Sequence, residues 1–391
     1  MSRLFLGRGL ETEADAYIDG GKSRAILVCG KRGSGKSYTL GVIAEELHRA
    51  ADATILIVDP MGIYHTMSLS NHEQESVLWD WGDSPRGLPV KVLVPGDPVE
   101  RYGGADIVAE MERRGVEFRS LALNPSDVSA ESWCDSFGTS INEPMGISLA
   151  KATRRCRQEY GARGYFIREI IDEVLKDPRA HDRTIDALVN RLEMANQWGI
   201  FAADRYRELA EILDPDSVNV LDLSVIDSGR YGRRGLIVSV LSRDLFRKRS
   251  IARRREELGL APERRKFWML IDEAHQFVPS GRSALGKEEL IRWVKEGRQP
   301  GLSLVVASQQ PSAIDGEVLS QCDVIISHAL TTSDDKTALN RLTKDYMRNE
   351  IKTYIDQLAR TGQAVFVDDD TERLEVVQIR PRASRPGGGE A

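Results

Sequence analysis

Short runs of apolar residues recur along the chain, separated by polar turns and by longer amphipathic stretches. In two early runs, residues 25–29 and 53–59, nearly every position is apolar, which is typical of strands buried on both faces of a sheet. Residues 38–50 lie between them and place apolar side chains at the spacing of one helix face. This alternation of strand and helix predicts an α/β fold with a mostly parallel sheet.

The same pattern continues to the end of the chain. Further buried strands are expected at residues 90–94, 118–123, 218–224, 267–273 and 302–308. Helices are expected at residues 165–176, 184–198, 235–258 and 284–297. Residues 1–22 look like a polar lead-in. We therefore predict one domain over residues 1–391, with a mostly helical insertion at about 125–215 and a short flexible tail at about 383–391.

Composition narrows the class of protein. The chain has 391 residues, of which 41% are hydrophobic and 29% charged, and no apolar run is long enough to span a bilayer. Its four cysteines form no C-x-x-C pair, so neither a zinc site nor disulfide stapling is expected, and we predict a cytoplasmic location without membrane contact. The net charge of −6 argues against a surface that binds nucleic acid everywhere. Residues 243–266 carry ten Lys or Arg against four Asp or Glu, which indicates either a solvated helix face or a phosphate or partner contact.

The first predicted strand runs directly into a phosphate-binding loop. Residues 30–37, Gly-Lys-Arg-Gly-Ser-Gly-Lys-Ser, fit G-x-x-x-x-G-K-[ST], and a helix follows, as this motif requires. Lys36 places a cation on the β- and γ-phosphates, and the hydroxyl of Ser37 can hold Mg²⁺. The alternative is a chance match in a flexible loop. We expect nucleotide contacts from Gly30, Lys31, Arg32, Gly33, Ser34, Gly35, Lys36, Ser37 and Tyr38.

The strand that begins at Phe267 ends in two adjacent acids. Asp272 is expected to hold Mg²⁺ opposite Ser37, and Glu273 to act as the general base for the water that attacks the γ-phosphate. The alternative is a pair of acids that only caps a helix. His275 is expected to be a hydrogen-bonded structural residue, or else to contact Glu273 or the nucleotide.

Polar residues close two other predicted strands. Gln309 follows residues 302–308 and is expected to sense the γ-phosphate or position water, unless it forms a plain turn before Pro311. Asp59 closes the second strand and either reaches the nucleotide site or forms a turn before Pro60.

Two arginines are candidates for stabilising charge in the transition state. Arg298 lies just before the strand at residues 302–308, and Arg24 lies just before the first strand. An arginine near the γ-phosphate can raise the rate by roughly 10³–10⁵. The alternative for both is an ordinary surface arginine.

An ordered set of motifs resembles the HerA–FtsK group of P-loop ATPases, most closely the HerA-like branch. Besides the phosphate loop and Leu270-Ile-Asp-Glu-Ala-His275, the set contains Asp59-Pro-x-Gly-x-Tyr64, Glu296-Gly-Arg298, Ser308-Gln-x-Pro-Ser312 and the closing segment Val376-Val-Gln-Ile-Arg-Pro-Arg382. The resemblance implies a RecA-like core that assembles into a ring, usually a homo-hexamer, with ATP and Mg²⁺ between subunits and double-stranded DNA in the pore. It also implies an effector partner, such as a nuclease, in DNA repair or anti-phage defence. Arg298 matches a position of this family associated with nucleotide sensing, and Arg24 matches one that acts across the subunit interface.

The chain departs from the family in two respects. The segment before the phosphate loop is too short for the β-barrel with which the family commonly begins. Ala329 and Gln310 stand where many relatives have arginine, so hydrolysis is expected to be slow or to depend on Arg24 or Arg298.

Three functions fit these observations. The first is an ATP-hydrolysing ring that translocates double-stranded DNA. The second is a scaffold or switch whose assembly is driven by ATP binding and which organises an effector with little DNA movement. The third is a secretion- or conjugation-type coupling ATPase, although such proteins usually carry membrane segments or large accessory domains, which this sequence does not show.

Overall fold

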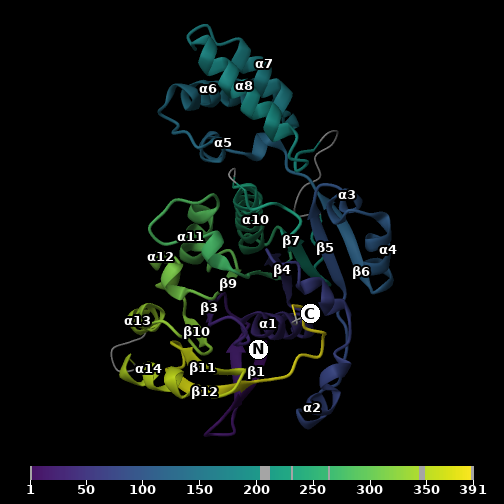
Figure 1. The fold of residues 1–391 in the computed structure, drawn as a ribbon, viewed down its shortest axis with the longest axis vertical. Helices are drawn as coiled ribbons and strands as arrows, with labels where there is room; N and C mark the ends of the chain where they lie inside the picture. Colours follow the sequence, from purple (N-terminus) through teal and green to yellow (C-terminus); the bar gives the residue numbers. More distant parts are fainter. Residues whose placement is uncertain (1, 203–211, 230–231, 263–264, 343–347, 389–391) are drawn as a thin grey trace.

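The computed structural model describes residues 2–202, 212–229, 232–262, 265–342 and 348–388 (Figure 1). Its strands are β1 Arg3–Gly9, β2 Asp15–Asp19, β3 Ala25–Cys29, β4 Ala53–Asp59, β5 Val90–Pro95, β6 Val116–Leu121, β7 Val218–Asp222, β8 Lys266–Ile271, β9 Leu302–Ser308, β10 Val324–Ser327, β11 Gln363–Asp368 and β12 Arg373–Ile379. They form one twelve-stranded sheet in the order β2-β1-β12-β11-β10-β3-β9-β8-β4-β7-β5-β6.

The larger part of the sheet is parallel. Every neighbouring pair from β10 to β6 is parallel, with β3 between β10 and β9. All residues of β3, β7 and β9 are buried, which agrees with the expectation from their continuous apolar runs. The predicted α/β class and mostly parallel sheet are confirmed. The predicted strands at residues 25–29, 53–59 and 302–308 match the observed bounds.

The antiparallel edge of the sheet differs from the prediction. Residues 1–22 are not only a polar lead-in, because they contain β1 and β2, and β1 pairs with β12 from the other end of the chain. The strands β10, β11 and β12 continue this edge in antiparallel pairs. The alternating apolar positions Leu4 and Leu6 of β1 are buried against helix α1, a pattern that the sequence analysis did not recognise.

Helices cover both faces of the sheet (Figure 1). Their bounds are α1 Lys36–Ala50, α2 Glu75–Asp80, α3 Pro98–Tyr102, α4 Ala105–Arg113, α5 Ala130–Phe137, α6 Pro144–Tyr160, α7 Ile167–Leu175, α8 Asp182–Asn196, α10 Arg233–Glu257, α11 Lys287–Glu296, α12 Gly316–Leu319, α13 Ser333–Leu342 and α14 Arg348–Gln357. Alternate residues of β3 enter two apolar clusters, one packed against α1 and the other against α10 and α11. The two faces together therefore enclose the core.

Helices α5 to α8 form a group that stands beyond the end of α10 in Figure 1. Their buried side chains, such as Trp133, Leu149 and Ile170, belong to the same apolar cluster as Leu236 and Leu241 of α10. On this continuity we propose that the group is an insertion in a single domain. Part of the expected insertion, residues 203–211, lies outside the described residues.

The basic run lies on the later turns of α10. Several of its cations pair with acids of the same helix, for example Lys248 with Asp244 at 2.8 Å and Arg249 with Glu256 at 2.8 Å. These four side chains are only 4% to 19% exposed, so the pairs are not the solvated helix face that was one expected alternative. They leave less of the positive charge for an outside partner.

The end of the chain also differs from the prediction. Residues 383–391 were expected to form a flexible tail, but Ala383 and Ser384 are buried, and Glu45 of α1 accepts hydrogen bonds from both of their backbone amides. A buried carboxylate that accepts backbone hydrogen bonds fixes this segment in place. Residues 389–391 lie outside the described part of the chain.

Among the helices that the structure describes, none combines the length and the hydropathy that crossing a bilayer requires.

Candidate active site

The phosphate loop joins β3 to α1 at the carboxyl edge of the parallel strands. Gly33 and Gly35 have φ angles of +73° and +117°, a backbone region that residues with a Cβ rarely adopt. A Cβ at Gly35 would also lie 3.2 Å from the ring of His328. These glycines therefore allow the loop to turn its backbone amides inward, toward the place where phosphate oxygens bind.

Lys36 is the first residue of α1 and is only 5% exposed. Its ammonium donates to the backbone oxygen of Lys31 at 3.2 Å, across the loop. Burial lowers the pKa of Lys36, although the charges of Glu273 and Asp272 act in the opposite direction. A desolvated cation held inside the loop is suited to contact phosphate oxygens.

Ser37 and Asp272 are brought together from α1 and from the end of β8. The Ser37 hydroxyl donates to Asp272 Oδ2 at 2.7 Å, and the Tyr64 hydroxyl donates to the same oxygen at 2.9 Å. Asp272 is buried, so these two hydroxyls fix the position of its carboxylate. A serine hydroxyl beside a carboxylate is an oxygen donor set suited to Mg²⁺.

Asp59 orders the loop that carries Tyr64. Its two oxygens accept the backbone amides of Met61, Gly62 and Tyr64 at 2.8 to 3.0 Å. Burial, together with the nearby charges of Asp222 and Asp272, raises the pKa of Asp59 to about 7. Asp59 therefore acts as the turn-forming residue, which was one of its two expected roles, and it positions Tyr64 against Asp272.

Glu273 and Gln309 end the neighbouring strands β8 and β9. Gln309 Nε2 donates to Glu273 Oε1 at 2.6 Å, and His275 Nδ1 lies 3.4 Å from Glu273 Oε2. The backbone of Glu273 has a φ of +47°, which is strained for a residue with a side chain. Strain of this kind concentrates at functional sites, where the surrounding structure maintains it.

The phosphate loop, Glu273 and Gln309 open on one cavity of about 610 Å³. The phosphate loop contributes Arg32, Gly33, Gly35, Lys36, Ser37 and Tyr38 to its lining, and Glu273 and Gln309 complete one part of the wall. Gly30, Lys31 and Ser34 belong to the loop but not to this lining, and Asp272 lies behind Ser37. The cavity thus unites the loop with the two polar side chains predicted from separate strands.

One support of the loop was not predicted from the sequence. His328 follows β10 and is fully buried, with Nδ1 2.8 Å from the Gln363 backbone oxygen and Nε2 2.9 Å from Thr39 Oγ1. Since a backbone oxygen only accepts, Nδ1 carries the proton and Thr39 donates to Nε2. Burial lowers the pKa of His328 to about 4, so the ring is neutral at pH 7. No local pattern indicated this role, because it depends on β10 pairing with β3.

The two candidate arginines lie at the amino ends of the parallel strands, whereas the phosphate loop lies at the carboxyl ends. Arg24 precedes β3 and Arg298 precedes β9, whereas the loop and Gln309 follow these strands. Seven residues of β9 span roughly 20 Å, so neither arginine reaches the phosphate loop of its own chain. Arg298 is exposed. The side chain of Arg24 is only 2% exposed and pairs with Asp323 at 3.0 Å and with Asp370 at 2.8 Å.

Replacing Arg24 with alanine should destabilise the fold. Burial disfavours its charge, but the Asp323 carboxylate and its neighbours outweigh this and raise the pKa of Arg24. Removing Arg24 leaves partly buried carboxylates without their cation. This should lower the free energy of unfolding by about 3 kcal/mol, the lower end for broken buried pairs. Urea unfolding would measure the loss.

Lys22→Ala is the matched control, because Lys22 pairs with the same Asp370 at 3.2 Å but is largely exposed. It should change the free energy of unfolding by under about 1 kcal/mol. If Arg24→Ala kept wild-type stability and lost only ATP turnover, Arg24 would instead act in catalysis across a subunit interface.

Comparison with known proteins places these observations in context. The family described as Helicase HerA, central domain, matches residues 4–245. The DNA double-strand break repair helicase HerA of Sulfurisphaera tokodaii is 30% identical over 368 residues, which cover 91% of this chain and 65% of that protein. The chain spans about two thirds of the length of the relatives that it matches, or slightly less.

Two solved structures share the fold. VirB4 of Thermoanaerobacter pseudethanolicus has a TM-score of 0.61 at 15% identity, covering 97% of this chain and 96% of that chain. The plasmid coupling protein TrwB, in complex with ADP and Mg²⁺, has a TM-score of 0.54 at 13% identity, covering 95% of this chain and 88% of that chain. At these identities the likeness concerns the fold alone, and it agrees with the predicted P-loop core.

Proposed function

The chain belongs to the family of HerA helicases, whose central domain matches residues 4–245, and from this premise we propose that it is an Mg²⁺-dependent ATPase that translocates double-stranded DNA. The proposal includes assembly into a ring, a homo-hexamer as in the resemblance described above, and coupling to an effector such as a nuclease in DNA repair or anti-phage defence. The repair helicase HerA of Sulfurisphaera tokodaii, named for double-strand break repair, supports the DNA substrate.

One observation carries the proposal. The hydrogen bonds of 2.7 Å from Ser37 to Asp272 and of 2.6 Å from Gln309 to Glu273 connect residues that follow three neighbouring strands, and Ser37, Glu273 and Gln309 line one cavity. This is the arrangement that hydrolysis of a nucleoside triphosphate needs, with separate groups for the phosphates, the metal and the attacking water.

Each residue has a distinct task in the proposed reaction. The loop amides and Lys36 hold the β- and γ-phosphates, and Ser37 and Asp272 are the oxygen donors that fit Mg²⁺. Mg²⁺, when bound, neutralises charge on the phosphates. Glu273 accepts the proton of the attacking water, and Gln309, fixed on Glu273 Oε1, orients that water. The complex of TrwB with ADP and Mg²⁺ supports the same cofactors.

The placement of Arg298 supports a site shared between subunits. It is exposed at the edge of the sheet opposite its own phosphate loop, so it can meet only the nucleotide of a neighbouring subunit. A closed ring joins one surface of each subunit to a different surface of the next, and we propose that the surface with Arg298 meets the neighbouring cavity. Arg298 is therefore our candidate for stabilising transition-state charge in trans.

A second function, the assembly switch, has one observation in its favour. The backbone oxygen of Ala329 accepts the amide of Lys31 at 2.8 Å, so residue 329 lies against the phosphate loop. An arginine at this position, as in many relatives, would stand near the phosphates, and alanine supplies no charge there. Slow hydrolysis that serves mainly to assemble an effector complex would follow.

ATP turnover with and without linear double-stranded DNA distinguishes the two functions. A translocase should hydrolyse ATP faster when DNA is present. Raising salt from 50 to 200 mM should increase the DNA concentration that gives half-maximal stimulation at least ~10-fold, because DNA binding releases counterions. A Lys36→Ala preparation gives the background. Turnover that DNA leaves unchanged at low salt would contradict the translocase and favour the switch.

A further inference from the structure

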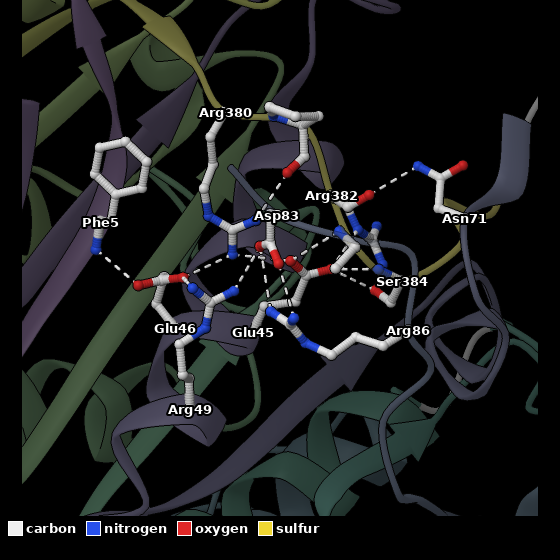
Figure 2. Close-up of polar contacts among 12 residues, drawn as sticks. Phe5, Glu45, Glu46, Arg49, Asn71, Asp83, Arg86, Arg380, Arg382 and Ser384 are labelled. Carbon is white, nitrogen blue, oxygen red and sulfur yellow. Dashed lines mark hydrogen bonds and ion pairs between the residues drawn. The ribbon is translucent and has the colours of Figure 1, made fainter. Parts of the chain in front are cut away.

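The segment after β12, residues 380–388, crosses the outer side of α1, and we call it the C-terminal strap. Two of its arginines meet two glutamates of α1 in a buried cluster (Figure 2). Arg380 Nη2 lies 2.8 Å from Glu45 Oε2 and 2.9 Å from Glu46 Oε1, and Arg382 Nε lies 3.7 Å from Glu45 Oε1. The sequence separates these partners by more than 330 residues.

The cluster holds the strap rigidly on α1. Burial raises the pKa of Glu45, but the charges of Arg380 and Arg382 and the hydrogen bonds from Ser384 outweigh it and lower the pKa overall. Both the amide and the hydroxyl of Ser384 donate to Glu45 Oε1, at 2.8 and 2.6 Å. Breaking one partner of such a buried, hydrogen-bonded set is strongly destabilising, so the strap keeps one position.

That position reaches the residue next to Ser37. The amide of Arg382 donates to the hydroxyl of Tyr38 at 2.7 Å, and Tyr38 in turn donates to Gln74 Oε1 at 2.6 Å. The guanidinium of Arg382 lies across Gly41, where a Cβ would come within 2.4 Å of its Cζ. The strap is thus locked against the first turns of the helix that begins with Lys36.

Beyond this lock, the strap becomes a wall of the nucleotide cavity. Pro381, Gly387 and Gly388 line it, together with Gln378 and Ile379 from β12. Gly387 packs so closely on the segment after β4 that an added Cβ would lie 2.2 Å from the Ile63 backbone oxygen. A side chain at this position therefore requires the strap and the segment at Ile63 to move apart.

Helix α2 and the residues that flank it supply a second part of the same wall. Val77 and Trp81 line the cavity, and so does Met61. Val77 is 44% exposed and Met61 is 59% exposed, so apolar surface faces the cavity. Gln74 also lines it; among the described residues its Oε1 accepts from Tyr38 and Asn71, which leaves its Nε2 as a donor for an occupant.

The chemistry of this wall identifies its occupant. A nucleoside triphosphate places its phosphates on the loop, where Lys36, Glu273 and Gln309 serve them, and its ribose and base must then occupy the rest of the cavity. A base offers flat apolar faces and hydrogen-bonding edges, which match apolar walls and an amide donor. We propose that the C-terminal strap and α2 form the subsite for the base and ribose. This inference rests on the proposed nucleotide-binding function of the same cavity.

Equilibrium binding of ATP and of inorganic tripolyphosphate, each with Mg²⁺, tests the subsite. Tripolyphosphate carries the phosphates without the base. The wild-type chain should bind ATP at least ~5-fold more tightly, since contacts to a base change a binding constant by roughly five- to hundredfold. Gly387→Ala, which moves the strap, and Val77→Ser, which removes apolar surface on the other wall, should each weaken ATP binding at least ~3-fold and leave tripolyphosphate binding unchanged.

Matched controls separate the subsite from general effects. Gly316→Ala adds a Cβ that meets no non-neighbouring atom of the described residues within 4 Å. Trp79→Ser removes a 64% exposed side chain from the same helix as Val77 but outside the cavity lining. Neither should alter the binding of either ligand. Equal affinity of the wild-type chain for both ligands, or equal weakening of both by the two test variants, would overturn the subsite and leave the ATPase proposal standing. A wild-type chain that binds neither ligand would overturn both.

Discussion

Replacing Lys36 with alanine should weaken ATP binding at least ~100-fold. The ammonium of Lys36 is buried inside the loop, and among the described residues it donates only to the Lys31 backbone oxygen, at 3.2 Å. An incoming phosphate therefore replaces one weak contact with charge-assisted hydrogen bonds, each worth about 1.5–3 kcal/mol. Loss of more than one such bond gives the stated factor, at roughly 1.4 kcal/mol for each tenfold change.

Isothermal titration with ATP and Mg²⁺ would measure the change. The shift that saturating ATP produces in the melting temperature should vanish in the same variant, because this shift depends on binding to the folded state. Lys352→Ala, an exposed lysine of α14, is the control and should bind ATP as the wild type does. Wild-type affinity in Lys36→Ala would refute the role assigned to the loop.

The loop and the two acids were predictable because their chemistry is local. Residues 25–50 contain the strand, the glycines, Lys36 and the helix in one continuous stretch, and the structure reproduces the strand bounds. Asp272 and Glu273 end a strongly apolar run, so their place at the carboxyl edge followed from the parallel sheet. Gln309 followed from the same argument, and its bond to Glu273 puts it in the cavity. Their catalytic tasks remain predictions.

The antiparallel edge was not predictable in the same way. The strand β10 has only four residues, and β12 is mostly half-buried, so neither gives a strong hydrophobic period. The position of His328 under the loop depends on β10, and the burial of Arg24 depends on Asp323 beside it. The missed antiparallel edge thus concealed His328, which supports the loop, and the structural role of Arg24, which lies away from the site.

The fixed position of the C-terminal strap could not be predicted from the sequence for a different reason. A Pro-, Arg- and Gly-rich ending has the composition of a mobile tail. Its arginines are fixed only because Glu45 and Glu46, far away in the sequence, are presented on one face of α1 (Figure 2). Long-range charge pairing of this kind leaves no trace in local composition.

Replacing Glu273 with glutamine should lower ATP turnover at least ~10²-fold while ATP binding stays within about 3-fold of wild type. The amide keeps the shape of the side chain but cannot take the proton of the attacking water, and a general base typically contributes 10²–10⁴. Glu273 is 8% exposed, its carboxylate accepts a hydrogen bond from Gln309 Nε2 at 2.6 Å, and its backbone is strained next to Asp272. These constraints aim it at one point of the cavity. Steady-state phosphate release would measure turnover, and titration with ATP would measure binding.

Measuring both turnover and ATP binding distinguishes a general base from a carboxylate that only maintains the structure of the site. Asp272→Asn removes a carboxylate bound to Ser37 and Tyr64, so it should impair Mg²⁺-dependent binding as well as turnover, because the oxygen donors for the metal are lost. Glu317→Gln, at an exposed position on α12, should leave both unchanged. If Glu273→Gln turned over ATP within about 3-fold of wild type, the base would lie elsewhere, and the strain at residue 273 would need another explanation. If it lost binding together with turnover, Glu273 would hold the nucleotide site together rather than activate water.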